Sequence, residues 1–108
     1  MDCLEGMQLI ADASVDLILC DLPYGMLKTK HTKWDVRIPF DKLWRQYRRI
    51  AKPNAAIILT CVHPFTNHLI NNIPKGYKYQ ELIWYKSSGS GFLNAKKKCI
   101  LSSMKILF

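Results

Sequence analysis

The 108-residue sequence has no long apolar run and only five glycines. Its apolar runs extend for about six residues, whereas a membrane-spanning helix needs about 20. No signal peptide is recognisable at the start of the chain. We therefore expect a cytoplasmic protein that does not associate with a membrane.

Acidic residues are also scarce. The chain has 8 of them against 16 lysines and arginines, which gives a formal net charge of +8. Such an excess favours a polyanionic partner such as nucleic acid. A solvated lysine surface would produce the same balance, so charge alone leaves both interpretations open.

Closely spaced cysteines are absent, so the pattern of a zinc site is missing and we expect no metal. The four cysteines are Cys3, Cys20, Cys61 and Cys99. Cys20 and Cys61 end apolar runs, which favours buried thiols over disulfides.

Helical and strand patterns alternate along the chain. A nearly continuous aliphatic run at residues 15–20 predicts a strand covered on both faces. The clearest helix is predicted at residues 41–51, where apolar side chains share one face. Further helices are expected at 4–11 and 65–73, strands at 55–62 and 77–86, and a flexible loop at 87–91. This order predicts one α/β domain with a mostly parallel sheet and flanking helices.

The segment Asp21-Leu22-Pro23-Tyr24 follows the first predicted strand. Ligands of open α/β sheets bind beyond the carboxyl ends of the strands. Pro23 favours an extended Leu22, whose carbonyl can then accept a hydrogen bond beside the Asp21 carboxylate. Two converging acceptors suit an –NH2 group, and Tyr24 offers a flat face for a planar base. The alternative is an ordinary turn, because aspartate often begins turns and proline restricts φ.

Methylation of an exocyclic amine needs such acceptors and such an aromatic face. The lone pair of such a nitrogen is delocalised into the ring, so the nitrogen is a poor nucleophile. Acceptors that bind its hydrogens favour a tetrahedral, more nucleophilic geometry, which is preorganised electrostatic stabilisation. The base must first leave the helix stack, and an aromatic platform helps to hold it.

The chain resembles adenine-specific DNA methyltransferases of the DPPY type, in which the catalytic segment precedes the cofactor segment. Short matching segments occur in the same order across most of the chain: Asp2-Cys3-Leu4-Glu5, Ser14-Val15-Asp16-Leu17-Ile18, Asp21-Leu22-Pro23-Tyr24-Gly25, Lys33-Trp34-Asp35, Lys52-Pro53-Asn54, Pro64-Phe65, Trp84-Tyr85-Lys86 and Gly91-Phe92-Leu93-Asn94-Ala95-Lys96.

The resemblance implies a partial Rossmann-like fold, DNA as partner and S-adenosylmethionine as methyl donor. It implies that Asp21 and the Leu22 carbonyl hold the target amine, that Pro23 shapes the turn and that Tyr24 stacks. Leu22 departs from the usual proline, with a mild expected effect because a carbonyl does not depend on the side chain. Aspartate at the first position resembles adenine-N6 enzymes more than cytosine-N4 enzymes.

Other site residues have two interpretations each. Asp2 lies where related enzymes place an acidic residue near the cofactor adenosine, or it is an exposed terminal aspartate. Phe92 lines the base pocket or packs under its loop. Trp34 and Trp44 are interpreted as core or loop anchors. Three lysines contact phosphates or are merely solvated: Lys28, Lys30 and Lys33.

The glycine-rich cofactor turn of such enzymes, Phe-x-Gly-x-Gly after a strand, is not found. Gly89-Ser90-Gly91 is interpreted as a loop instead. We therefore expect residues 1–97 to be the catalytic part of a methyltransferase domain and residues 98–108 to be a divergent tail. A frameshift between about Lys96 and Ser103 would explain the tail, because a one-base shift at Ser103-Met104-Lys105 can read His-Glu-Asp.

Three functions remain in view. The first is an adenine-specific DNA methyltransferase, incomplete in this chain. The second is an inactive remnant that at most binds nucleic acid weakly. The third is a methyltransferase for another amine, such as a protein glutamine or an RNA base, although those enzymes resemble Asn-Pro-Pro-Tyr patterns more. The sequence does not indicate the recognition sequence or the oligomeric state.

Overall fold

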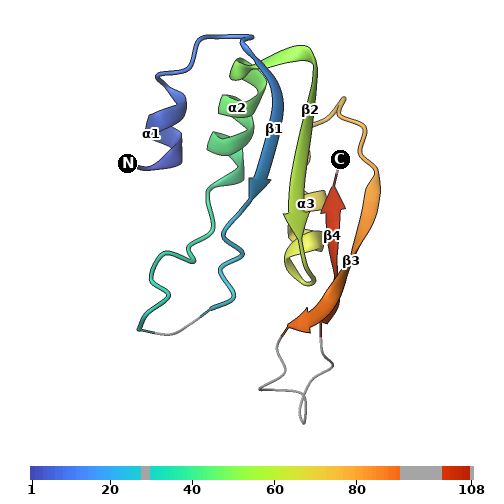
Figure 1. Ribbon diagram of the computed structural model, residues 1–108. Helices are drawn as coiled ribbons and strands as arrows, with labels where there is room; N and C mark the ends of the chain where they lie inside the picture. Colours follow the sequence, from blue (N-terminus) through green and yellow to red (C-terminus); the bar gives the residue numbers. More distant parts are fainter. Residues whose placement is uncertain (28–29, 91–100, 108) are drawn as a thin grey trace.

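The computed structural model describes residues 1–27, 30–90 and 101–107. Helices and strands alternate over most of this chain, as the sequence predicts (Figure 1). The elements in chain order are α1 (Cys3–Met7), β1 (Val15–Asp21), α2 (Phe40–Ile50), β2 (Ala51–Cys61), α3 (Phe65–Ile70), β3 (Glu81–Ser90) and β4 (Leu101–Leu107).

The strands form one sheet in the order β1-β2-β4-β3. β1 and β2 are parallel, whereas β4 runs antiparallel to both β2 and β3. The prediction of a mostly parallel sheet is therefore wrong, because the last strand turns back and inserts between two strands that run in one direction. A mixed sheet with flanking helices is compatible with a partial Rossmann-like fold, since such folds often include a reversed strand near one edge.

The core is a single cluster on one face of the sheet. Leu43, Trp44, Tyr47 and Ile50 of α2 are buried, as expected from their helical spacing. They pack with side chains from the other helices and from the first two strands: Met7, Phe65, Leu69, Ile18, Leu59 and Cys61. This packing fixes β1 and β2 side by side, with their carboxyl ends at the same edge of the sheet.

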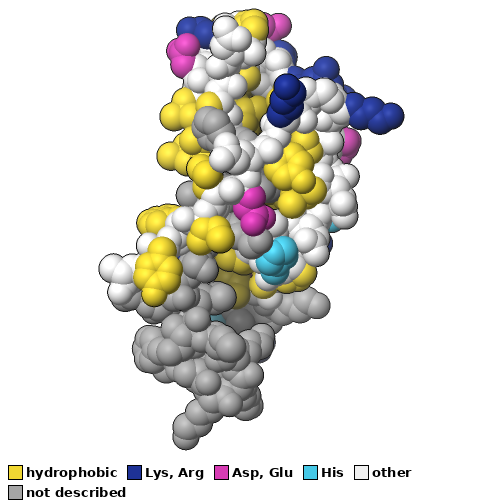
Figure 2. Space-filling model, turned by 90° about the vertical axis from the view of Figure 1, so that its right-hand side faces the viewer, with side chains coloured by type: hydrophobic (Ala, Val, Ile, Leu, Met, Phe, Trp, Pro, Cys, Tyr) yellow, Lys and Arg dark blue, Asp and Glu magenta, His cyan; other side chains and the backbone are white. Residues whose placement is uncertain are grey.

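The opposite face of the sheet is apolar but open to solvent. Leu17 and Leu19 are 51% and 68% exposed. The register places Leu82 and Trp84 of β3 on the same face, and both are exposed. Figure 2, viewed from the side where β3 lies, shows several groups of hydrophobic side chains at the surface. The prediction that β1 is covered on both faces is wrong for the described residues.

Several predicted boundaries also need correction. α1 ends at Met7 rather than at residue 11, and α3 ends at Ile70 rather than at residue 73. β3 begins at Glu81 and continues to Ser90, so the predicted loop at 87–91 is strand as far as residue 90. Residues 101–107, where no pattern was evident, form β4 because β2 and β3 offer backbone partners on both sides.

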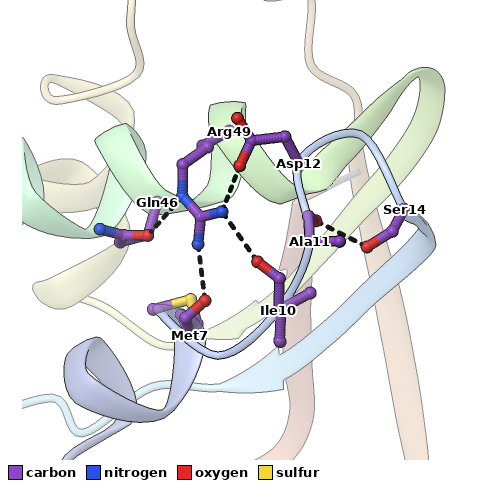
Figure 3. A network of polar contacts seen from close by, with 7 residues as sticks. All are labelled: Met7, Ile10, Ala11, Asp12, Ser14, Gln46 and Arg49. Atoms are coloured by element: carbon purple, nitrogen blue, oxygen red, sulfur yellow. Dashed lines mark hydrogen bonds and ion pairs between the residues drawn. The ribbon is translucent and has the colours of Figure 1, made fainter.

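Arg49 connects α1 to α2 (Figure 3). Its guanidinium donates to the Met7 carbonyl at 2.6 Å and to the Ile10 carbonyl at 2.8 Å. It also pairs with the Asp12 carboxylate and donates to the Gln46 amide oxygen. The Met7 carbonyl also accepts from the Ile10 N–H at 3.1 Å, so Arg49 adds a further donor at the end of α1 and holds the turn that leads into β1.

Candidate active site

The residues 21–24 lie at the carboxyl end of β1, where Asp21 is paired in parallel register with Thr60 of β2. The Thr60 hydroxyl donates to Asp21 Oδ1. The Tyr24 hydroxyl donates to the same oxygen at 2.8 Å. One carboxylate oxygen is therefore held by two donors. Among the described residues, no hydrogen bond is seen to Asp21 Oδ2 or to the Leu22 carbonyl.

A pocket of about 410 Å³ opens in front of this turn. It is lined by all four residues of the predicted motif together with Met26, Leu27, Trp34 and Asp35. The structure thus brings the motif together at one concave site, with two free acceptors and two aromatic side chains on its walls.

The aromatic residues differ from the sequence interpretation in one respect. Trp44 is buried, in agreement with a core anchor, but Trp34 is 67% exposed and lines the pocket. Tyr24 packs against Phe65 of α3 with ring centroids 4.9 Å apart, so its ring orientation is fixed from behind. Trp34 is therefore free to contact a ligand. Its exposure contradicts the interpretation of Trp34 as a core anchor, whereas the alternative of a loop anchor stays a prediction.

The loop that follows the motif is held by Asp35. Its carboxylate accepts hydrogen bonds from the backbone N–H groups of Gly25, Met26 and Leu27 at 2.7–2.8 Å. These bonds, that of Leu27 foremost, lower the pKa of Asp35, so the carboxylate stays ionised. We call this arrangement the Asp35 clasp. It fixes the backbone directly after Tyr24.

Arg37 holds the same loop from another side. Its Nε donates to the Tyr24 carbonyl at 2.8 Å. Gly25 has φ +65°, which favours glycine, and a Cβ added there would lie 2.7 Å from Arg37 Cγ. The turn therefore needs a glycine at position 25 for both backbone conformation and space.

The Tyr24 hydroxyl is a donor at all ordinary pH values. Burial raises its pKa to about 12, and the hydrogen bond to Asp21 adds to this because a phenolate would repel the carboxylate. The neutral phenol thus keeps Asp21 Oδ1 occupied, and this leaves Oδ2 as the oxygen available to a ligand.

The other predicted site residues are less integrated. The Asp2 carboxylate accepts from the Leu4 N–H at 2.7 Å and caps α1. Its neighbour Cys3 has a raised pKa, mainly from burial and then from the charges of Asp2 and Cys20. Lys30 and Lys33 are exposed in the loop between β1 and α2. Lys28 and Phe92 lie outside the described residues.

Sequence reasoning missed three residues that shape the site, namely Thr60, Asp35 and Arg37. Thr60 could have been inferred, because it ends the aliphatic part of the second strand and parallel strands align their carboxyl ends. Asp35 and Arg37 reach the loop across about ten residues of irregular chain, and no periodic pattern marks such contacts.

The glycine-rich turn that the resemblance implies for the cofactor, between a strand and a helix, is not seen among the described residues. Gly89 lies within β3, not in a turn between a strand and a helix. The glycines with positive φ in the described chain are Gly25 and Gly76, and neither begins a helix after a strand. We therefore assign no described residue to the methyl donor. Asp2 as a cofactor contact stays a prediction.

Two classes of feature are absent from the parts of the chain that the structure covers. No group of three or more His, Cys, Asp or Glu side chains could hold a metal ion there. In the same residues, no helix combines the length and apolar character needed to cross a bilayer.

Comparison with known proteins does not identify the chain. No model of a known protein family matches it, and no curated protein matches it.

Proposed function

We propose that this chain provides the target-amine side of an adenine-N6 DNA methyltransferase. The observation that carries the proposal is the pair of free acceptors at the carboxyl end of β1. Asp21 Oδ2 and the Leu22 carbonyl lack partners among the described residues, whereas Oδ1 is held by Tyr24 and Thr60. An exocyclic –NH2 group has two donors, one for each acceptor.

The surroundings of these acceptors suit a flipped base. Tyr24 and Trp34 line the same pocket of about 410 Å³, and stacking of a base on an aromatic side chain contributes about 1–3 kcal/mol. The fixed ring of Tyr24 and the exposed ring of Trp34 would hold the base while Asp21 and Leu22 bind its amine. Acceptors that bind both hydrogens of the amine would draw its nitrogen towards a tetrahedral, more nucleophilic geometry.

The electrostatic balance also favours DNA. The net charge of +8 attracts phosphates, and the exposed Lys30 and Lys33 lie in the loop that borders the pocket. In this proposal the chain binds and orients the base, and S-adenosylmethionine would supply the methyl group. The groups that hold the donor are not assigned.

A binding experiment can test the amine-holding role without methyl transfer. We would measure the affinity of a fluorescein-labelled 12-mer of thymidine with one central adenine, and of the same strand with purine, which lacks the amine. Two hydrogen bonds predict that the adenine strand binds about tenfold more tightly, equivalent to 1.4 kcal/mol. In Asp21→Ala the adenine and purine strands should bind with equal affinity.

Asp16→Ala is the matched control, because Asp16 lies on the same strand but at its other end, where it pairs with Lys52. This variant should keep the tenfold preference. Equal affinity of the original chain for the adenine and purine strands would reject the proposal. Transfer of label from S-adenosylmethionine to DNA, lost in Asp21→Ala, would additionally show a complete enzyme; binding without transfer would agree with the assignment of the amine side alone.

A further inference from the structure

A second pocket of about 410 Å³ lies away from the active site, between β2 and the segment that leads into β3. Residues 55–57 of β2 form one bank, and residues 77–80 form the other. We call this pocket the strand slot. Neither bank contains a residue of the proposed amine site, so a ligand of the slot would be independent of the proposed function.

The strand slot continues the path of β4. Leu107 is paired with Leu59 on one side and with Glu81 on the other. Because both pairings are antiparallel, a strand that extends along this line past residue 108 would face Ile57 and Tyr79, and then Ala56 and Lys78. At the mouth of the slot, β2 and β3 are two interstrand spacings apart, about 9.5 Å. That width accommodates one extended strand.

Both banks have backbone groups without partners. The pairing of β2 with β4 covers residues 59–61 and stops there. On the other bank, no backbone hydrogen bond of Lys78, Tyr79 or Gln80 is seen among the described residues. A row of free N–H and C=O groups is a template for strand addition. Here two such rows face each other.

Trp44 adds an independent observation. It lines the slot from α2, is 7% exposed, and its buried Nε1–H has no hydrogen-bond partner among the described residues. Buried polar groups are normally satisfied, so the Trp44 Nε1–H is a donor that a ligand of this pocket could use.

Basic side chains surround the far end of the slot. An adjoining cavity shares Ala55, Ile57, Tyr77 and Lys78 with the slot and is also lined by Arg48 and Lys75. Arg48, Lys75 and Lys78 have no ion pair in the described parts of the chain. Figure 2 shows lysine and arginine side chains gathered at the upper end of the molecule, where β2 begins in Figure 1.

We propose that the strand slot binds an extended peptide segment with an acidic carboxyl-terminal end. The peptide runs antiparallel to β2 in continuation of β4. Every second residue faces the core, because the position opposite Ile57 is on the same face as Leu59, and these residues are apolar. The acidic end then meets Arg48, Lys75 and Lys78. Backbone pairing gives affinity, and the alternating side chains and the end charge give specificity.

A folded second copy of the chain fits the slot less well. An edge strand of a folded sheet has one free side, whereas this slot offers partners on both sides. Two copies would also each have a charge of +8 and would repel each other. A single extended segment, free on both sides, is the occupant that the geometry favours.

The test uses the full chain and three synthetic peptides. The first is acetyl-Thr-Ile-Thr-Ile-Glu-Glu. The second has proline in place of the central threonine and cannot complete the ladder. The third ends in Lys-Lys-amide instead of Glu-Glu. Affinity is followed by tryptophan fluorescence, and amide hydrogen exchange locates the bound peptide.

We expect the first peptide to bind and to slow exchange of the amides at residues 78–80. The proline peptide should bind at least tenfold more weakly and the lysine peptide at least fivefold more weakly. Lys78→Glu should reduce or reverse the preference for the acidic peptide, since it alters only a side chain at the rim. Binding that tolerates proline, or protection elsewhere in the chain, would overturn the proposal. So would a dimer in sedimentation that the acidic peptide does not dissociate.

Discussion

The Arg49 contacts make a quantitative prediction about stability. Arg49→Ala removes the hydrogen bonds to the Met7 and Ile10 carbonyls, and it also breaks the ion pair with Asp12. A hydrogen bond to a charged group contributes about 1.5–3 kcal/mol. We take the lower value for each carbonyl, because the Arg49 side chain is 29% exposed. The exposed ion pair adds about 0.2–1 kcal/mol.

The sum is a loss of about 3–4 kcal/mol, a large part of the ~5–15 kcal/mol that stabilises a small domain. Urea unfolding followed by circular dichroism should show this loss, and the thermal midpoint should fall by more than about 10 °C. Arg49→Lys should recover less than half, since an ammonium group cannot span two carbonyls in a fixed plane. Exchange of the α1 amides should accelerate, because the helix loses its attachment to α2.

Arg48→Ala is the control. Arg48 is adjacent in the same helix but has no ion pair among the described residues, so its removal should change the unfolding free energy by less than about 0.5 kcal/mol. The reasoning is refuted if Arg49→Ala and Arg48→Ala have the same stability, or if α1 exchanges at its original rate without Arg49.

Three more predictions concern the loop between β1 and α2. Asp35→Asn should speed hydrogen exchange of the backbone amides of Gly25, Met26 and Leu27. In the unsubstituted chain the pKa of Asp35 is lowered, so the clasp is present above the ordinary aspartate pKa of about 3.9 and opens only as the pH falls through the lower folded value. A pH series of amide NMR spectra would show this opening. Gly25→Ala and Gly76→Ala should each lower the free energy of unfolding by about 1–2 kcal/mol, because both glycines have left-handed backbone. Only Gly25→Ala should also disturb the loop amides and weaken binding of the adenine strand. Equal binding by the two variants would contradict the packing argument at position 25. The pKa of Tyr24 is raised to about 12, so its contribution to stability is present below the unfolded pKa of about 10 and is lost as the pH rises towards 12. The free energy of unfolding in urea should therefore decrease more over this interval for the unsubstituted chain than for Tyr24→Phe.

Periodic patterns predicted the parts of the fold that depend on a repeated burial face. α2 is found at residues 40–50, within one residue of the prediction, because Leu43, Trp44 and Tyr47 all face the core. β1 is likewise found where the aliphatic run lies. The same run was misread in one respect, since apolar residues at Leu17 and Leu19 indicate what a face could bury but not whether another layer covers it.

Features that depend on distant partners could not be predicted. The sequence of β4 has no distinctive alternation, and its strand conformation comes from pairing with β2 and β3 on either side. At the site, the motif at residues 21–24 predicted acceptors at the carboxyl end of β1, and the structure has a pocket there that these residues line. The Asp35 clasp and the Arg37 contact were missed because each is a hydrogen bond between irregular segments, for which neither helical nor strand spacing gives a signal.

The central position of β4 has a consequence for how the sheet is assembled. β3 reaches β2 only through β4, which comes after both of them along the chain. During synthesis, β1, α2 and β2 can associate early, but β3 has no strand to pair with until residues 101–107 have been made. The pairing of β4 with its two neighbours must therefore form last. Until then, β2 and β3 expose unpaired backbone groups to the surrounding solution. We expect this interval to be the time at which the nascent protein is most prone to aggregate.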